Sequence, residues 1–291
     1  MKVLVSTDSS CLINYELLNK LGISLFPLNV IVDGEEFLDG ITINQETLCS
    51  AMRENKVIKT STPAYGTILE YFDKLFDQGY DHIIHFTISS KLSSMYNLFK
   101  TIANDEYENK LTIIDSYSVS SLMLSHVLYA YDEIQKGTSI DEIAKVIEQR
   151  KNECQVYFVP ENLNALKNGG RISPTIAAIA NTIGIKPVIV LQDGELEKYK
   201  MIKNTKHALS DKFNELIKEY PISKYDYTIV SFDCKSTTFD YIYGKINESL
   251  ESESVLTGII PINVCAHCGP GTIGLVVSPR INGKSNYEYI K

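Results

Sequence analysis

The chain has 291 residues, of which 44% are hydrophobic and 22% charged, with a formal net charge of −8 at pH 7. This composition is typical of a globular protein with a substantial core, and the acidic balance argues against a nucleic-acid-binding surface. No run of about 18 apolar residues occurs, so the sequence predicts no transmembrane helix.

The N-terminal half alternates predicted strands and helices. Its first residues turn polar too soon for a secretion signal, so we expect a cytoplasmic protein whose six cysteines are free thiols. Hydrophobic runs predict strands at residues 3–5, 23–32, 83–88 and 111–114. Helical spacing and start signals predict helices at residues 15–21, 45–54, 63–78, from 94 onward and 139–152. This alternation predicts a mostly parallel sheet covered by helices on both faces.

The pattern changes near residue 155, where we place a domain boundary. Residues 1–155 are predicted to form an α/β domain, residues 156–280 an α+β domain, and residues 281–291 a loose tail. The second part contains a predicted strand near 156, a short helix ending at 169–170, a helix at 175–183, a hairpin over 186–202 with its turn at 193–194, two helices around a strand at 227–234, and strands near 256–264 and 275–278.

A glycine run near the C-terminus permits three interpretations. Residues 269–274 fit the dinucleotide fingerprint, but a strand-like run follows where that fingerprint requires a helix. Cys265, His267 and Cys268 resemble zinc ligands, but the chain has no second cluster to complete the site, so we predict no metal. The third interpretation is a glycine turn that presents His267 to an anion. A core histidine bonded to the backbone accounts equally well for the sequence.

Two hydroxyl-rich segments, residues 60–62 and 89–94, precede predicted helices. Serine and threonine are preferred helix caps, and the same hydroxyls with free N–H groups also bind anions. Arg171 follows two glycines and fits an anion-binding or partner-docking residue, or a solvated arginine.

Taken in order, several short motifs resemble the DegV family of bacterial fatty-acid-binding proteins over residues 3–279. They are VSTDSS at 5–10, TSTPA at 60–64, SSKLS at 89–93 with YN at 96–97, IDS at 114–116, GGRIS at 169–173, KP and DG at 186–187 and 193–194, and HCGPGTIG at 267–274. The resemblance implies an N-terminal α/β domain, a C-terminal α+β domain, and a lipid tunnel between them.

The resemblance also implies a ligand and a role. A palmitate-like long-chain fatty acid would occupy the tunnel, with no cofactor. The ligand-binding residues implied by the family are Thr60, Ser61, Thr62, Ser93, Ser94 and His267.

Relatives of this kind present the bound acid to a separate fatty-acid kinase, which makes acyl-phosphate. Arg171 and Lys203 correspond to kinase-docking positions, and Lys203 stands where kinase-partnered members often carry arginine. We expect a monomeric carrier rather than an enzyme. The alternative is a serine hydrolase or acyltransferase that uses Ser93 and His267 with Asp8 or Asp115, although no nucleophile elbow surrounds Ser93.

Overall fold

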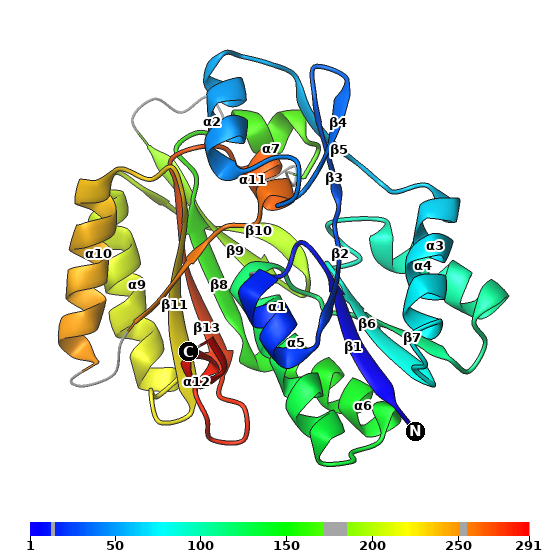
Figure 1. The fold of residues 1–291 in the computed structure, drawn as a ribbon. Coiled ribbons are helices and arrows are strands. Elements are labelled where there is room, and N and C mark those ends of the chain that lie inside the picture. The colour runs from blue at the N-terminus through cyan, green and yellow to red at the C-terminus, as the bar shows by residue number, and fades with distance from the viewer. Residues whose placement is uncertain (13–14, 172–184, 251–254, 291) are drawn as a thin grey trace.

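A computed structural model describes residues 1–12, 15–171, 185–250 and 255–290. The fold contains two large sheets and one small sheet with helices packed around them (Figure 1). The helix predicted at 175–183 lies outside the described residues. Within the part of the chain that is described, no helix is long and apolar enough to cross a membrane.

The first sheet is parallel throughout and has the order β2-β1-β6-β7. Its strands are β1 (Val3–Asp8), β2 (Ser24–Phe26), β6 (His82–Thr87) and β7 (Leu111–Asp115). Successive residues of a strand face opposite sides, so Val5 packs under one helical layer and Leu4 under the other. The first layer comprises α1 (Tyr15–Leu21), α5 (Ser120–Gln135) and α6 (Ile140–Arg150), and the second α3 (Tyr65–Phe76) and α4 (Met95–Glu106). The predicted parallel sheet is therefore confirmed.

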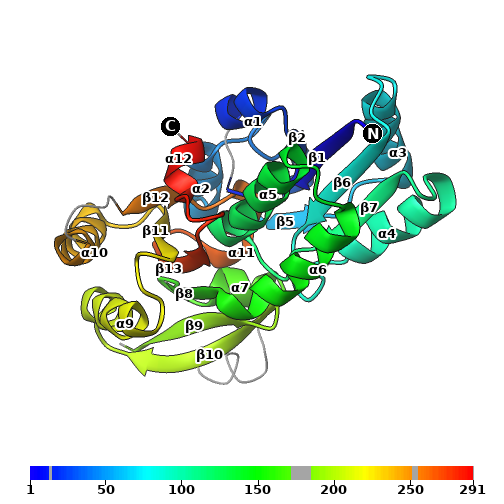
Figure 2. The ribbon, with the colours of Figure 1, turned by 90° about the horizontal axis from the view of Figure 1, so that it is seen from below.

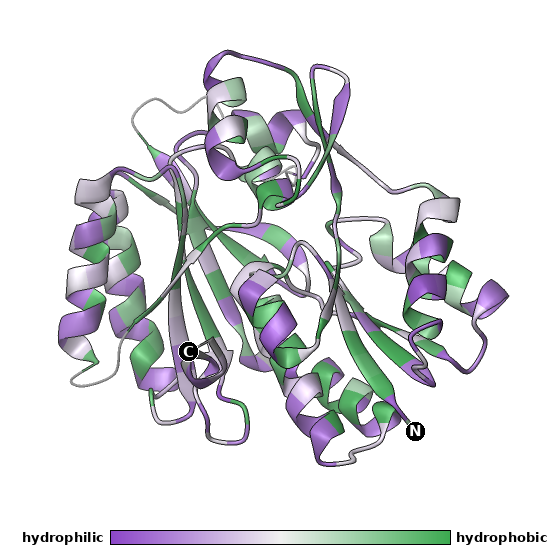
Figure 3. Cartoon of the chain, in the orientation of Figure 1, coloured by the Kyte–Doolittle hydropathy of each residue, from purple (hydrophilic) through white to green (hydrophobic). Residues whose placement is uncertain are grey.

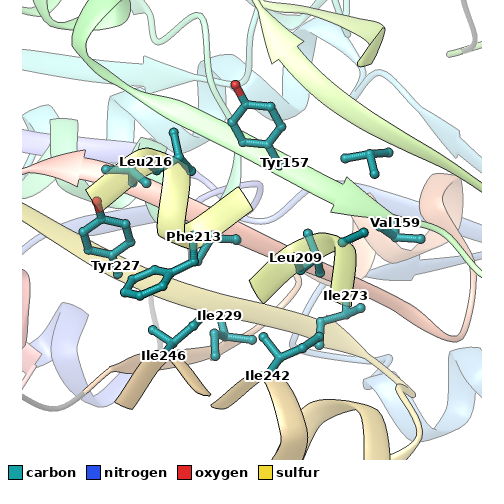
Figure 4. Packing of buried hydrophobic residues seen from close by; sticks show 14 of the residues in the cluster. Tyr157, Val159, Leu209, Phe213, Leu216, Tyr227, Ile229, Ile242, Ile246 and Ile273 are labelled. Carbon is teal, nitrogen blue, oxygen red and sulfur yellow. The ribbon is translucent and has the colours of Figure 1, made fainter. Parts of the chain in front are cut away.

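The second sheet has the order β10-β9-β8-β13-β11-β12 and is antiparallel except between β11 and β12. Its strands are β8 (Gln155–Val159), β9 (Lys186–Gln192), β10 (Glu195–Ile202), β11 (Tyr225–Phe232), β12 (Leu256–Ile259) and β13 (Thr272–Pro279). Helices α9 (Thr205–Glu219) and α10 (Ser236–Ser249) cover one face, and Phe213 and Ile242 fill the core beneath them (Figure 4). Figure 2 shows these two helices at the opposite side of the molecule from α3 and α4.

A small antiparallel sheet, β4-β3-β5, is built from β3 (Asn29–Val32), β4 (Glu35–Leu38) and β5 (Ile58–Ser61). Strands β3 and β5 contact α11 (Ile262–Cys268), which in turn contacts α2 (Gln45–Arg53) and α7 (Asn164–Asn168). Val30 and Leu48 share one buried cluster with Val230 and Cys265. Packing of this N-terminal segment against C-terminal strands brings the two halves of the chain together. The domain division near residue 155 stays a prediction.

Five local predictions differ from the structure. The strand expected at 23–32 is interrupted at Pro27, and its two pieces, β2 and β3, belong to different sheets. Proline has no N–H for a sheet ladder, so the chain leaves one sheet there and enters another. Thr60 and Ser61 lie on strand β5, and α3 begins later, after Ala64.

The other differences lie near the C-terminus. The strand expected at 256–264 ends at Ile259, and His267 lies in the last turn of α11 rather than on a glycine turn. Residues expected to be loose form α12 (Asn286–Ile290), where the Asn286 backbone N–H donates to Asp226 Oδ2 at 2.7 Å. Hydrophobic residues concentrate on the strands of both large sheets, while the helices carry hydrophilic faces (Figure 3).

Candidate functional site

An interior cavity of ≈ 150 Å³ lies where the three sheets meet. Residues from the carboxyl ends of β1 and β6, from β5, from α11 and from the second sheet line it. Ligands characteristically bind beyond the carboxyl ends of parallel strands, and here α11 and the small sheet cover that edge. Most of the wall is apolar, formed by Leu28, Ile88, Leu92, Met95, Val119, Val156, Phe158, Leu166, Leu191, Leu196, Val230, Ile260, Val264 and Val276.

Hydroxyl, imidazole and guanidinium groups gather on one part of this wall. All six residues predicted to bind the ligand line the cavity, together with Arg171; they are Thr60, Ser61, Thr62, Ser93, Ser94 and His267. Lys203 is exposed, follows β10 and does not line the cavity. The structure thus brings together residues from four separate chain segments, and their role in binding stays a prediction.

The His267 imidazole is held from both sides. Its Nε2 is 2.8 Å from Thr60 Oγ1, and its Nδ1 faces Gly169, where an added Cβ would lie only 2.2 Å away. Burial, followed by the nearby charge of Arg171, lowers the pKa of His267 to about 4. The imidazole is therefore neutral at pH 7. Within the described chain, Nδ1 has no hydrogen-bond partner.

Arg171 contributes a positive charge to the cavity wall. Its Nε donates to the Leu92 carbonyl at 3.2 Å and its Nη1 to the Gly169 carbonyl at 2.6 Å. These bonds connect the end of α7 to the loop before α4 and orient the planar guanidinium. A fixed guanidinium beside hydroxyls and a neutral imidazole provides the donors that an anionic head group needs.

Helix α11 is anchored by a buried carboxylate that sequence reasoning did not identify. Asp39 is 4% exposed, accepts from the Asn263 backbone N–H at 3.1 Å, and accepts from Ser9 Oγ at 2.9 Å. Burial raises the pKa of Asp39 to about 6. A carboxylate from the N-terminal half therefore caps the helix that carries His267. One signal in the sequence points to this cap: Asp39 lies one residue after β4, next to the turn that begins with Gly40.

Asp39→Ala is expected to lower the free energy of unfolding by about 1–3 kcal/mol, because it leaves buried donors of α11 unpaired. Urea denaturation of the two proteins measures the difference. Asp211→Ala on the exposed face of α9 is the matched control and should change stability by less than about 0.5 kcal/mol. Equal stability of the Asp39 variant and the parent protein would contradict this capping role.

Stability is also expected to fall as the pH falls from about 6.5 to 4. Burial lowers the pKa of His85 and His126 to about 3 and that of His267 to about 4. As the pH falls through this range, these histidines are therefore protonated in the unfolded chain before they are protonated in the folded protein, which favours unfolding. Burial raises the pKa of Asp8 and Asp39 to about 6, so these carboxylates are protonated in the folded protein before they are protonated in the unfolded chain. This effect restores part of the stability that the histidines lose. The three histidine shifts together exceed the two aspartate shifts.

Urea denaturation at pH 7 and at pH 4.5 measures this loss. His267→Gln should lose less stability than the parent protein over the same interval, by up to a few kcal/mol, since one pKa unit corresponds to about 1.4 kcal/mol. An identical loss in both proteins would show that His267 does not titrate as described.

The described residues do not assemble a hydrolase relay. Ser93 Oγ accepts from the Met95 N–H at 3.3 Å, whereas His267 pairs with Thr60. Asp8 accepts from the backbone N–H groups of Ser10 and Ile88, so it does not orient the imidazole. Asp115 likewise accepts from backbone N–H groups of neighbouring loop residues. No group of three or more metal-ligating side chains occurs among the residues described.

The fold and cavity define an α/β protein of two large sheets and one small sheet, with a mostly apolar interior cavity whose wall carries hydroxyl, imidazole and guanidinium groups on one part. Residues 2–280 match the sequence model described as "Uncharacterised protein, DegV family". The chain belongs to the DegV family.

Individual relatives agree with this assignment. The chain is 29% identical over 280 residues to a DegV domain-containing protein of Staphylococcus aureus, covering 95% of this chain and 98% of that protein. A solved structure described as "Fatty Acid Binding of a DegV family Protein from Thermus thermophilus" is similar at a TM-score of 0.86 and 22% identity, covering 96% and 100% of the two chains. A stearic acid-binding protein of Eubacterium ventriosum is similar at a TM-score of 0.83 and 23% identity, covering 94% and 97%.

Proposed function

We propose that this protein binds a long-chain, palmitate-like fatty acid in the cavity, with the carboxylate at its hydroxyl-rich part. The observation that carries the proposal is the clustering of Thr60, Ser93, His267 and Arg171 on one part of the wall of a mostly apolar cavity. Membership of the DegV family and the fatty acids named for the similar solved structures support it.

The apolar wall of the cavity matches the acyl chain of such a ligand, and the hydroxyl-rich part matches its carboxylate. Each buried CH₂ contributes roughly 0.8 kcal/mol, so an acyl chain alone supplies ample affinity. A carboxylate removed from water must be hydrogen-bonded or paired with a cation. Hydroxyl and imidazole donors with the Arg171 guanidinium meet that requirement, since a guanidinium combines a positive charge with several N–H donors.

We further propose that the protein acts as a cytoplasmic, monomeric carrier that transports the acid or presents it to a fatty-acid kinase. In that scheme the kinase holds ATP and makes the acyl-phosphate, and Arg171 and the exposed Lys203 contribute to docking. The position of Arg171 in the cavity wall also allows it to contact the carboxylate. The two roles of Arg171 are separable by experiment.

Mass spectrometry of the purified, denatured protein tests the carrier function directly. We expect an intact long-chain fatty acid to be released in near-stoichiometric amount. A lipid-free protein that turns over acyl esters, and that loses this activity in Ser93→Ala, would instead support the hydrolase alternative.

Ser93→Ala is expected to weaken fatty-acid binding about tenfold, because a hydrogen bond to a charged group contributes about 1.5–3 kcal/mol. Titration of the delipidated protein with a fluorescent fatty acid measures the affinity. Ser249→Ala, at the exposed end of α10, is the control and should bind as the parent protein does. Unchanged affinity in the Ser93 variant would remove this serine from the site.

A further inference from the structure

A second polar group lies on the wall of the same cavity, formed by Ser10, Ser120 and Asn263. Their exposed fractions are 0%, 6% and 5%, so all three are more than nine-tenths buried. They come from the loop after β1, the first residue of α5 and the first turn of α11. The Ser120 backbone N–H donates to the Ser10 carbonyl at 2.7 Å, which fixes these two serines next to each other.

The hydrogen bonds of these side chains are incomplete within the protein. Asn263 Nδ2 donates to Ser10 Oγ at 2.7 Å, and the Ser10 hydroxyl itself hydrogen-bonds to the Asp8 carboxylate, so Ser10 is already paired. Neither Asn263 Oδ1 nor Ser120 Oγ has a partner in the described part of the chain. Buried polar atoms almost always have partners, and unpaired ones cost free energy. This group therefore presents one unpaired acceptor, Asn263 Oδ1, and one unpaired hydroxyl, that of Ser120, to the cavity.

This group is distinct from the proposed carboxylate site. Asn263 and His267 are four residues apart on α11, so their side chains lie on the same face one turn apart. The rise along the helix between them is about 6 Å, at 1.5 Å per residue. A ligand whose carboxylate lies near His267 and whose chain runs along α11 would pass the second group a few carbons further on.

We propose that the second polar group recognises a hydroxyl on the acyl chain, making this protein selective for hydroxylated fatty acids. This inference rests on the proposed fatty-acid binding and names its substrate class. A hydroxyl donates to Asn263 Oδ1 and accepts from Ser120 Oγ, which satisfies both unpaired side chains. A methylene satisfies neither of them, and a ketone can accept but cannot donate. A site built to hydrogen-bond a hydroxyl discriminates strongly against the analogue without it.

Isothermal titration calorimetry of the delipidated protein tests the preference. The probes are hexadecanoic acid, a positional series of its monohydroxy derivatives and the matching oxo derivatives. We expect at least one hydroxy acid to bind about tenfold or more tightly than hexadecanoic acid and more tightly than its oxo counterpart. The ratio of the affinity for the hydroxy acid to the affinity for hexadecanoic acid should fall toward one in Ser120→Ala and in Asn263→Ala.

Ser121→Ala provides the matched control. Ser121 is the next residue of α5, is equally buried and also lacks a partner for its hydroxyl among the described residues, but does not line the cavity. Its variant should keep the parent preference. Binding of hexadecanoic acid with no hydroxy acid binding more tightly would overturn the inference, as would a preference that survives in both test variants. Failure of hexadecanoic acid and all derivatives to bind would refute the proposed function itself.

Discussion

Replacing Gly169 with alanine is expected to weaken fatty-acid binding about a hundredfold, or about 2.8 kcal/mol, while the fold persists. The backbone at Gly169 has φ −77° and ψ −10°, which alanine adopts without strain. The added Cβ, however, would lie 2.2 Å from His267 Nδ1 and 3.1 Å from the Ala165 carbonyl oxygen. The imidazole cannot retreat without losing its 2.8 Å contact with Thr60, so it must leave its position.

Gly170→Ala is the control, because it strains the backbone but places no atom against the His267 imidazole. Gly170 has φ +68°, and no atom lies within 4 Å of an added Cβ. This variant should lose about 1–2 kcal/mol of stability through backbone strain, yet keep its fatty-acid affinity within about twofold. Fluorescent-lipid titration and thermal unfolding of both variants separate the two effects. Normal binding by Gly169→Ala would mean that the position of the imidazole is unimportant for the carboxylate.

Much of the fold could be predicted because its signals are local. The helix predicted from residue 139 is α6, and a capping box between Ser139 and Glu142 begins it. The turn at Asp33 and Gly34 joins β3 to β4, and both residues have positive φ. In each case a few neighbouring residues determine the backbone through their own hydrogen bonds or conformational preferences.

Helix α5 was not predicted, and its burial explains why. Residues 120–130 are buried without interruption, since α5 packs against β1, β13 and α6. A helix that is covered on all sides has no polar stripe, so the 3.6-residue period that reveals surface helices is weak. Its buried polar residues, such as Ser121 and Ser125, weaken the apolar pattern further.

The cavity illustrates a different limit of sequence reasoning. Its hydroxyls and His267 were singled out from short motifs, but Asp39 and Asn263 were not, and Gly169 entered only as part of the GGRIS motif without its contact to His267. Each of these three acts through a contact with a residue far away in the chain: Asp39 with α11, Asn263 with Ser10, and Gly169 with His267. Contacts of such long sequence separation leave no periodic trace in a single sequence, so only the folded chain reveals them.

Arg171→Gln is expected to weaken fatty-acid binding by about a factor of 100, because the variant loses the positive charge that lines the cavity. Glutamine can still donate to the Leu92 carbonyl, so the loop before α4 should keep its position. The reduced affinity would then report the missing charge rather than a displaced loop. The pKa of His267 should rise in this variant, since the Arg171 charge contributes to lowering it.

Lys203→Gln separates carboxylate binding from docking. Lys203 is exposed and does not line the cavity, so its variant should bind fatty acid within about twofold of the parent protein. Direct titration with fatty acid, in the absence of any kinase, compares the two variants, and NMR titration of the imidazole follows the pKa of His267. Full fatty-acid affinity in Arg171→Gln, with an unchanged His267 pKa, would leave Arg171 with only the docking role that its sequence motif implies. A loss in Arg171→Gln alone would place its guanidinium on the carboxylate.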